Sequence, residues 1–255
     1  MYKFRWFIFE STRLEIKIRY RGSLLGILWS FINPSLQAVI IFFVFREVLG
    51  VQDIENVDFF VYIYSGVLVL NFFLTTLLSG GELIFSKNHL MRNTQISLHT
   101  FLAITIASNT INLIVGSIPL SIYMSIKENL FSARLIYLPF LLGIMFIWLL
   151  AGGALLNMIY SRFLDLRQLM PIILGLLVYL TPIYYSMQSL SGQFLKTVVG
   201  FNPLTIILSG FRFSLGITDN ISTLALIIIW FIGMALWPIA SRISRDYREK
   251  VWAVQ

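Results

Sequence analysis

Six long apolar stretches constrain this chain more than any other feature of its sequence. A bilayer core about 30 Å thick requires roughly 20 consecutive apolar residues in a helix. Inside lipid the backbone must satisfy its own hydrogen bonds, so stretches this apolar are predicted to be helices. The fold class predicted is an all-α integral membrane protein with six transmembrane helices, at about residues 27–46, 59–80, 101–126, 135–160, 169–186 and 221–241.

Composition excludes an ordinary soluble domain. Hydrophobic residues make up 58% of the chain and charged residues only 12%, against a usual charged share of about 25%. The chain has no cysteine, and its two histidines, His89 and His99, lie in one short stretch. No disulfide and no metal site is therefore expected. Charged residues recur through the first 21 positions, so no cleavable signal peptide is expected either.

The positions of lysine and arginine predict the orientation. If the N-terminus is cytoplasmic, most of the 19 Lys and Arg residues fall in segments on the cytoplasmic side. Both termini are therefore predicted to be cytoplasmic. The net charge of +7 then reflects topology and contact with anionic lipid, and nucleic-acid binding is not expected.

Residues 1–22 are too charged to span a bilayer and form an amphipathic pattern. Basic residues gather on one helical face, and Glu15 is the exception within the apolar stripe. Such a helix is predicted to lie flat in the membrane interface. The alternative is an ordinary cytosolic amphipathic helix. The apolar face holds Phe4, Phe7, Ile8, Leu14 and Ile18, and the charged face holds Lys3, Glu10, Arg13, Lys17 and Arg21.

The turn from this segment into the first span carries Gly22 and Gly26. Two glycines four residues apart permit another helix to approach closely. Pro34, near the start of the first span, is expected to kink or loosen a helical turn.

Two further segments are predicted to form short helices. The segment 82–100, in which polar and apolar residues are interleaved, is predicted to dock on a soluble partner; the alternative is a solvated loop. The candidates for contact with the partner are Glu82, Phe85, Lys87, Leu90 and Arg92. Residues 186–220 are cut by glycines and by Asn202-Pro203 into apolar pieces, which predicts two half-inserted helices that form an outer gate. The gate candidates are Phe194, Phe201, Pro203 and Phe211, and residues 242–255 are expected to form a cytoplasmic tail.

No catalytic constellation is present, so no enzymatic activity and no catalytic residues are expected. Leu78–Glu82 resembles the signature sequence of ABC ATPases, but the chain has no phosphate loop and the match is interpreted as a coincidence. The span interiors carry neutral polar residues rather than ionisable ones, which disfavours ion-coupled transport. A transport function would therefore take its energy from a partner.

Aromatic and neutral polar residues inside the spans suit a conduit for a glycan, because sugar rings stack on aromatic planes and sugar hydroxyls pair with amides. For each residue, lipid contact or helix packing stays open as the alternative. The candidates for the lining are Phe31, Gln37, Phe42, Phe45, Tyr62, Tyr64, Phe72, Tyr179 and Tyr184.

Several motifs, in order along essentially the whole chain, resemble ABC-2 type permeases that export polysaccharides. They are Arg19–Trp29 followed by Asn33-Pro34, then Asp165–Arg167, Leu180–Tyr185, and Asn202–Leu204 with Phe211-Arg212. Within the family, the chain is most similar to the Wzm-type subunit for lipid-linked O-antigen, and relatives export capsule or teichoic acid.

This resemblance implies a homodimer in the bacterial inner membrane, bound to two copies of a separate ATPase that carries the ATP and Mg²⁺. No cofactor is expected in this chain. The resemblance also implies a channel lined by the first and fifth spans, and ATPase contacts from segment 82–98 and the N-terminal helix. The substrate would be a polysaccharide on undecaprenyl diphosphate, whose pyrophosphate would meet Arg13, Lys17 and Arg21.

Two alternatives stay open at this point. One is an ABC-2 permease for a small hydrophobic substrate such as a drug. The other is a membrane-embedded enzyme of lipid or glycan synthesis. The second is disfavoured because the largest acidic group, Asp53, Glu55 and Asp58, has no histidine or basic partner nearby in sequence.

Overall fold

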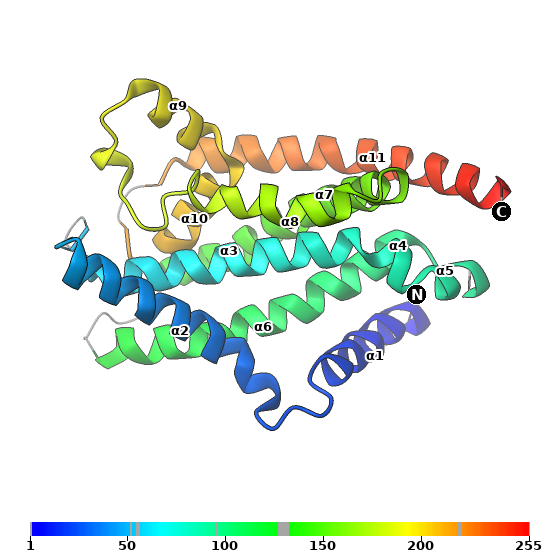
Figure 1. The fold of residues 1–255 in the computed structure, drawn as a ribbon, viewed down its shortest axis with the longest axis horizontal. Coiled ribbons are helices and arrows are strands. Elements are labelled where there is room, and N and C mark those ends of the chain that lie inside the picture. The colour runs from blue at the N-terminus through cyan, green and yellow to red at the C-terminus, as the bar shows by residue number, and fades with distance from the viewer. Residues whose placement is uncertain are drawn as a thin grey trace.

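Helices form nearly all of the regular structure of this chain (Figure 1). The computed structural model describes residues 2–51, 53–54, 57–94, 96–126, 133–218 and 221–254. In this part of the chain no strand occurs, only one isolated bridge between Ile54 and Val57. The helices are α1 (Tyr2–Arg19), α2 (Trp29–Phe43), α3 (Phe59–Gly81), α4 (Leu83–Ser86), α5 (Asn88–Thr94), α6 (Leu98–Ile126), α7 (Leu138–Arg162), α8 (Leu166–Gly175), α9 (Gln193–Phe201), α10 (Pro203–Ser214) and α11 (Thr223–Val254).

Five helical segments are long and apolar enough to cross a membrane, and they coincide with five of the six predicted spans. They are Gly26–Val48, Phe59–Gly81, Leu98–Ile126, Arg134–Arg162 and Thr223–Arg242. The all-α membrane fold is thereby confirmed. Pro34 lies inside α2 without ending it. Helix α11 continues to Val254, so the segment expected as a tail extends the last helix.

The fifth crossing differs from the prediction in its outer part. Helix α8 and a following 3-10 turn end at Val178, whereas the predicted span reached residue 186. Pro182 explains the early end, because proline disfavours a helical conformation of the preceding residue and donates no N–H. The segment nevertheless runs along the length of α3: Arg167 pairs with Glu82 just after α3 ends, and the Tyr62 hydroxyl donates to the Tyr185 carbonyl near the start of α3.

The two ends of the bundle are distinct in Figure 1. The N-terminus, α4, α5 and the C-terminal end of α11 lie at one end, here called the α5 end. Helices α9 and α10 lie at the other, here called the α10 end. This arrangement is the one that an even number of crossings produces.

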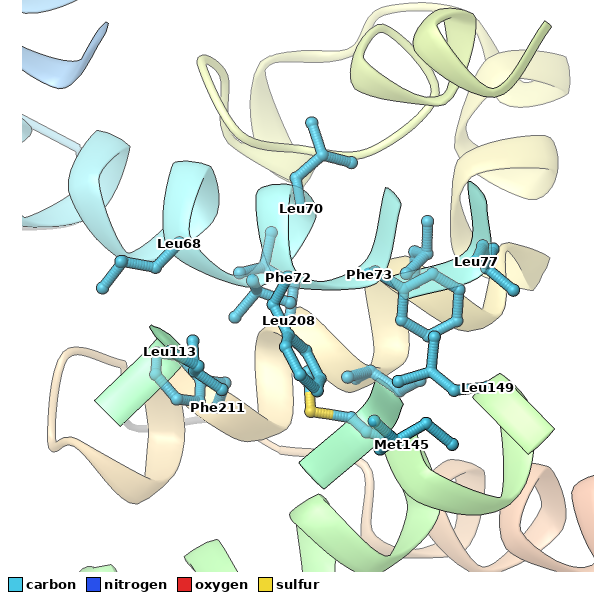
Figure 2. Close-up of a cluster of buried hydrophobic side chains, with 14 of the residues drawn as sticks. Leu68, Leu70, Phe72, Phe73, Leu77, Leu113, Met145, Leu149, Leu208 and Phe211 are labelled. Atoms are coloured by element: carbon cyan, nitrogen blue, oxygen red, sulfur yellow. The ribbon is translucent and has the colours of Figure 1, made fainter. Parts of the chain in front are cut away.

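Helix α3 forms the centre of the bundle. It packs against α2, α6, α7 and α10, and 78% of its membrane-spanning window is buried, compared with 11% for α2. Figure 2 shows side chains of α3 meeting those of α6, α7 and α10 in one apolar cluster, with Leu68, Leu70, Phe72, Phe73, Leu77, Leu113, Met145, Leu149, Leu208 and Phe211 labelled.

Small residues let α3 and α7 approach closely at the α5 end. A Cβ added to Gly81 would lie 2.6 Å from the Tyr160 ring, and one added to Gly80 would lie 3.3 Å from the Cα of Gly153. Such contacts between small residues drive helix association in membranes. The Asn157 amide also donates to the carbonyls of both α3 glycines. The glycines of Leu78–Glu82 therefore serve packing, which agrees with the interpretation of that motif as a coincidence.

A buried arginine fastens the broken fifth crossing to α3. Arg212, on α10, is only 2% exposed. Its guanidinium donates to the Pro182 carbonyl at 2.8 Å, the Tyr62 carbonyl at 2.9 Å and Ser65 Oγ at 3.2 Å, and it lies 3.4 Å from the centroid of the Tyr62 ring. Gly66 makes room, because a Cβ there would lie 3.1 Å from the guanidinium.

Two more side chains satisfy carbonyls that the interrupted helix leaves free. Asn202 Nδ2 donates to the Leu180 carbonyl at 2.9 Å, and the Tyr185 hydroxyl donates to the Tyr179 carbonyl at 2.9 Å. Asn202 also caps α10, since its Oδ1 accepts from the Leu204 amide at 3.0 Å. Non-helical backbone at membrane depth is tolerated where protein groups satisfy it in this way.

Replacing Arg212 by Gln should destabilise the protein by about 3 kcal/mol, because each buried carbonyl left without a donor costs about 1–3 kcal/mol. Thermal unfolding of the detergent-solubilised protein measures the loss. The matched control is Arg46→Gln, which breaks an exposed ion pair with Asp53 and should cost about 1 kcal/mol or less. Equal shifts in both variants would contradict the role assigned to Arg212.

Candidate functional site

A polar cavity of about 380 Å³ lies between α2, α3 and α6. Its lining is unusual for the interior of a membrane bundle, because polar side chains outnumber apolar ones and only one of them is charged. Ligand sites in proteins typically have volumes of about 300–1,000 Å³. The lining residues are Arg19, Tyr20, Trp29, Ser30, Asn33, Pro34, Gln37, Leu68, Asn71, Phe72, Thr75, Asn109, Asn112 and Leu113.

Five side-chain amides from three membrane-spanning helices meet at this cavity. They belong to Asn33, Gln37, Asn71, Asn109 and Asn112. Polar groups removed from water are costly unless they are hydrogen-bonded, and the Asn71 amide donates to Gln37 Oε1 at 2.8 Å. Asn33 and Gln37 are nevertheless exposed on the surface of the protomer. Their surface is therefore suited to face water or a polar partner rather than lipid.

A charged pair fastens α1 to the wall of the cavity. Arg19 donates to Asn109 Oδ1 at 2.5 Å and lies 3.4 Å from Glu15. Ser108 Oγ, on α6, donates to Glu15 at 2.8 Å. We call these four residues the α1 clasp. The clasp explains why Glu15 interrupts the apolar stripe of α1: its carboxylate faces α6 and accepts hydrogen bonds there.

The turn after α1 is held by Tyr20. Its hydroxyl lies 2.6 Å from Ser30 Oγ and donates to Asn112 Oδ1 at 3.1 Å. Gly22 and Gly26 have φ values of +78° and +53°, and nothing lies within 4 Å of a Cβ added to either. Within the described part of the protomer, therefore, no helix packs closely against these glycines. They are needed because the turn adopts a left-handed backbone conformation.

Residues of the motifs Arg19–Trp29 and Asn33-Pro34 therefore meet in one site. Comparison with known proteins identifies the family. Residues 8–215 match the ABC-2 type transporter family. The chain belongs to this family.

Three curated relatives of this ABC-2 chain are each named O-antigen export system permease protein RfbA. The relative from Myxococcus xanthus is 24% identical over 214 residues, which cover 83% of this chain and 81% of that protein. A relative from Klebsiella pneumoniae is 26% identical over 243 residues, covering 88% and 85%. Another from the same organism is 26% identical over 219 residues, covering 79% and 76%.

The structure separates the aromatic lining candidates of this ABC-2 chain into different environments. Gln37 and Phe72 line the polar cavity. Tyr62 and Tyr64 are 4% and 0% exposed, and the Tyr64 hydroxyl donates to the Gly116 carbonyl at 2.8 Å. Neither tyrosine reaches a surface of the protomer.

The other aromatic candidates lie outside the cavity. Phe42 packs against Phe59, and Phe45 lies against both Phe59 and Tyr184. Tyr179 directly follows the 3-10 turn after α8 and is 72% exposed. Phe31 contributes to a separate apolar groove between α2 and α6.

The two short helices predicted between the fifth and sixth spans are present as α9 and α10, which meet at an angle of 75°. Phe194 and Phe201 on α9 are 78% and 81% exposed. Pro203 begins α10 directly after the Asn202 cap. Phe211 is buried against the bundle, so this gate candidate is part of the core rather than of an exposed surface.

The docking candidates lie at the α5 end, on α4, on α5 and just before α4. Glu82 pairs with Arg167 at 2.6 Å, and Arg167 lies 4.8 Å from the centre of the Phe85 ring. Phe85 and Leu90 are exposed. Lys87 and Leu90 border a groove beside α1. Arg92 lies in α5, and its side chain is outside the described part of the chain.

The predicted headgroup residues Arg13, Lys17 and Arg21 are all exposed, on α1 and the turn that follows it. Sequence reasoning did not select Arg19 and Asn109 as site residues, although both border the cavity. The polarity of Asn109 and Asn112 within an apolar span was the available signal. Among the described residues, no group of three or more His, Cys, Asp or Glu side chains is placed to hold a metal ion.

Breaking the α1 clasp should release α1 from α6. Because the chain has no cysteine, a single cysteine can report on this. Thr12 on α1 is 6% exposed, so Thr12→Cys should react slowly with a water-soluble maleimide. Adding Arg19→Ala should raise the labelling rate roughly tenfold, since hydrogen bonds to charged groups contribute about 1.5–3 kcal/mol. Adding Lys17→Ala, at an exposed position, should leave it unchanged. An unchanged rate after Arg19→Ala would show that other contacts hold α1.

Proposed function

We propose that this chain is the permease subunit of an ATP-driven exporter in the bacterial inner membrane. Its substrate is a polysaccharide linked to undecaprenyl diphosphate, such as O-antigen, which passes through a channel at the interface of a homodimer. Membership of the ABC-2 family supports a transport role. The names of three relatives, O-antigen export permeases, support a polysaccharide substrate.

One observation supports this proposal most strongly. Gln37, at the middle of α2, and Asn33, one turn before it, are both exposed. Helix α2 has the smallest buried share among the candidate spans. Uncharged amides at this depth are costly in lipid. A water-containing channel formed with a second copy of the chain gives them hydrogen-bond partners, and a glycan can slide past groups that bind it weakly.

The ends of the bundle support the remaining parts of the proposal. The N-terminus, α4, α5 and the end of α11 share one end of the molecule (Figure 1), which suits a cytoplasmic face that binds an ATPase. Arg13, Lys17 and Arg21 are exposed on α1 and the turn that follows it and would attract the anionic headgroup of the lipid carrier. Helices α9 and α10 would form the gate on the outer face.

A different observation favours a second candidate function, the transport of a small hydrophobic substrate. An apolar groove of about 420 Å³ lies between α2 and α6, lined by residues that include Leu28, Phe31, Ile118, Pro119 and Ile122. A groove of this kind suits a small hydrophobic substrate that enters from the lipid, as in a drug permease. It has none of the amides found in the polar cavity.

Deletion of the gene tests the proposed substrate. We expect loss of long-chain polysaccharide from the cell surface and accumulation of lipid-linked glycan inside the cell, measured by surface labelling and by extraction of carrier lipid. Complementation with the wild-type chain should restore the surface glycan. Normal surface glycan in the deletion strain would favour the small hydrophobic substrate instead.

Docking of the ATPase should depend on the exposed apolar side chains of α4 and α5. The double variant Phe85→Asp, Leu90→Asp should lose at least tenfold in the amount of ATPase that copurifies with the tagged permease, because charge replaces apolar contact. The control Phe194→Asp, on α9 at the α10 end, should copurify normally. Normal copurification of the double variant would exclude this surface as the docking site.

A further inference from the structure

We propose that the polar cavity between α2, α3 and α6 is a binding site for one uncharged sugar residue of the transported glycan. This inference rests on the proposed function and extends it. It places sugar recognition within each protomer, at a defined pocket beside the channel rather than along the channel wall alone.

The charge of the cavity favours an uncharged ligand. Arg19 is the one charged residue in the lining, and its guanidinium is already engaged by Glu15 and by Asn109 Oδ1. The two charges of the clasp offset one another. An anionic diphosphate would therefore find no free positive group in the lining, whereas the exposed Arg13, Lys17 and Arg21 remain available to it.

The chemistry of the lining matches a sugar ring on two counts. Amide groups donate and accept together, as neighbouring hydroxyls of a sugar require. Trp29, Tyr20 and Phe72 add aromatic surface for the C–H face of the ring. The volume of about 380 Å³ lies at the small end of the range for ligand sites, which fits a single sugar ring rather than a longer oligosaccharide.

One amide group in the cavity wall lacks a partner. Asn109 is 4% exposed, and its Nδ2 has no acceptor among the described residues. A buried donor without an acceptor costs about 1–3 kcal/mol. A sugar hydroxyl that enters beside Asn109 would bring an acceptor oxygen to it after a small rotation of the amide.

The cavity opens where a passing polymer would reach it. Gln37 and Asn71 are joined by a 2.8 Å hydrogen bond, and Gln37 and Thr75 are exposed. These three residues form the mouth, on the surface of α2 and α3. The same α2 surface carries Asn33 and is the one proposed to face the second protomer. A sugar unit of a chain in the channel could therefore turn sideways into the cavity.

The test uses the purified permease–ATPase complex in nanodiscs, with neutral methyl hexosides as probes and inorganic pyrophosphate as the competitor. Saturation-transfer NMR detects weak binding at millimolar concentration. We expect transfer to at least one hexoside in the wild-type complex and no competition by pyrophosphate. Asn33→Leu and Asn71→Leu should each reduce the transfer at least fivefold. The matched control Gln193→Leu, exposed on α9 and away from both the cavity and the docking surface, should leave it unchanged.

Copurification of the ATPase and a single symmetric elution peak confirm that each variant is folded. Three results would each overturn the inference: no transfer to any of the hexosides, unchanged transfer in Asn71→Leu, or competition by pyrophosphate. The proposed function is tested separately by the deletion strain. Loss of surface glycan in that strain combined with unchanged hexoside binding in Asn71→Leu would reject the sugar site and leave the export function standing.

Discussion

The fold depends on hydrogen bonds to the backbone carbonyls that are left free where the helix of the fifth crossing is interrupted. The fifth crossing stops being helical after Val178, and the carbonyls that follow accept hydrogen bonds from side chains of other elements. Arg212 supplies the central donors from a position that is almost fully buried. Since water is absent from the bilayer core, these donors make the interruption possible. They also fix α10 against α3, which positions the bent pair α9–α10 at one end of the bundle.

The α1 clasp is a second polar arrangement, and it links α1 to the polar cavity. The α1 clasp holds the amphipathic helix against α6, and Arg19 and Asn109 of this clasp also border the polar cavity. A displacement of α1 would therefore act directly on the cavity wall. In the proposed exporter, α1 lies beside the surface expected to bind the ATPase, so the clasp offers a short physical connection between that surface and the transport path.

Much of the fold could be predicted from the sequence, because long apolar runs in lipid leave few alternatives to helices. The interruption of the fifth crossing could not be predicted in this way, because its residues are as apolar as those of a continuous span. Pro182 was the one local indication that the helix ends early. Arg212 lies in the segment 186–220 that was predicted to form an outer gate, yet it is buried. The sequence could not indicate this, because only the tertiary structure shows which carbonyls need a donor. Tyr62 and Tyr64 were predicted to line a channel, but period and composition do not distinguish a face toward a channel from a face toward the core. Glu15 was visible as an exception, and the structure supplied its partner.

The central claim, ATP-driven movement of lipid-linked glycan, is tested most directly in inverted inner-membrane vesicles that contain the permease and its ATPase. The quantity measured is the fraction of lipid-linked glycan that an added glycosidase cannot reach. If the account is right, ATP should increase this protected fraction, and vesicles with a catalytically inactive ATPase should show no increase. A protected fraction that stays the same with and without ATP, in vesicles where the complex is intact, would contradict the account.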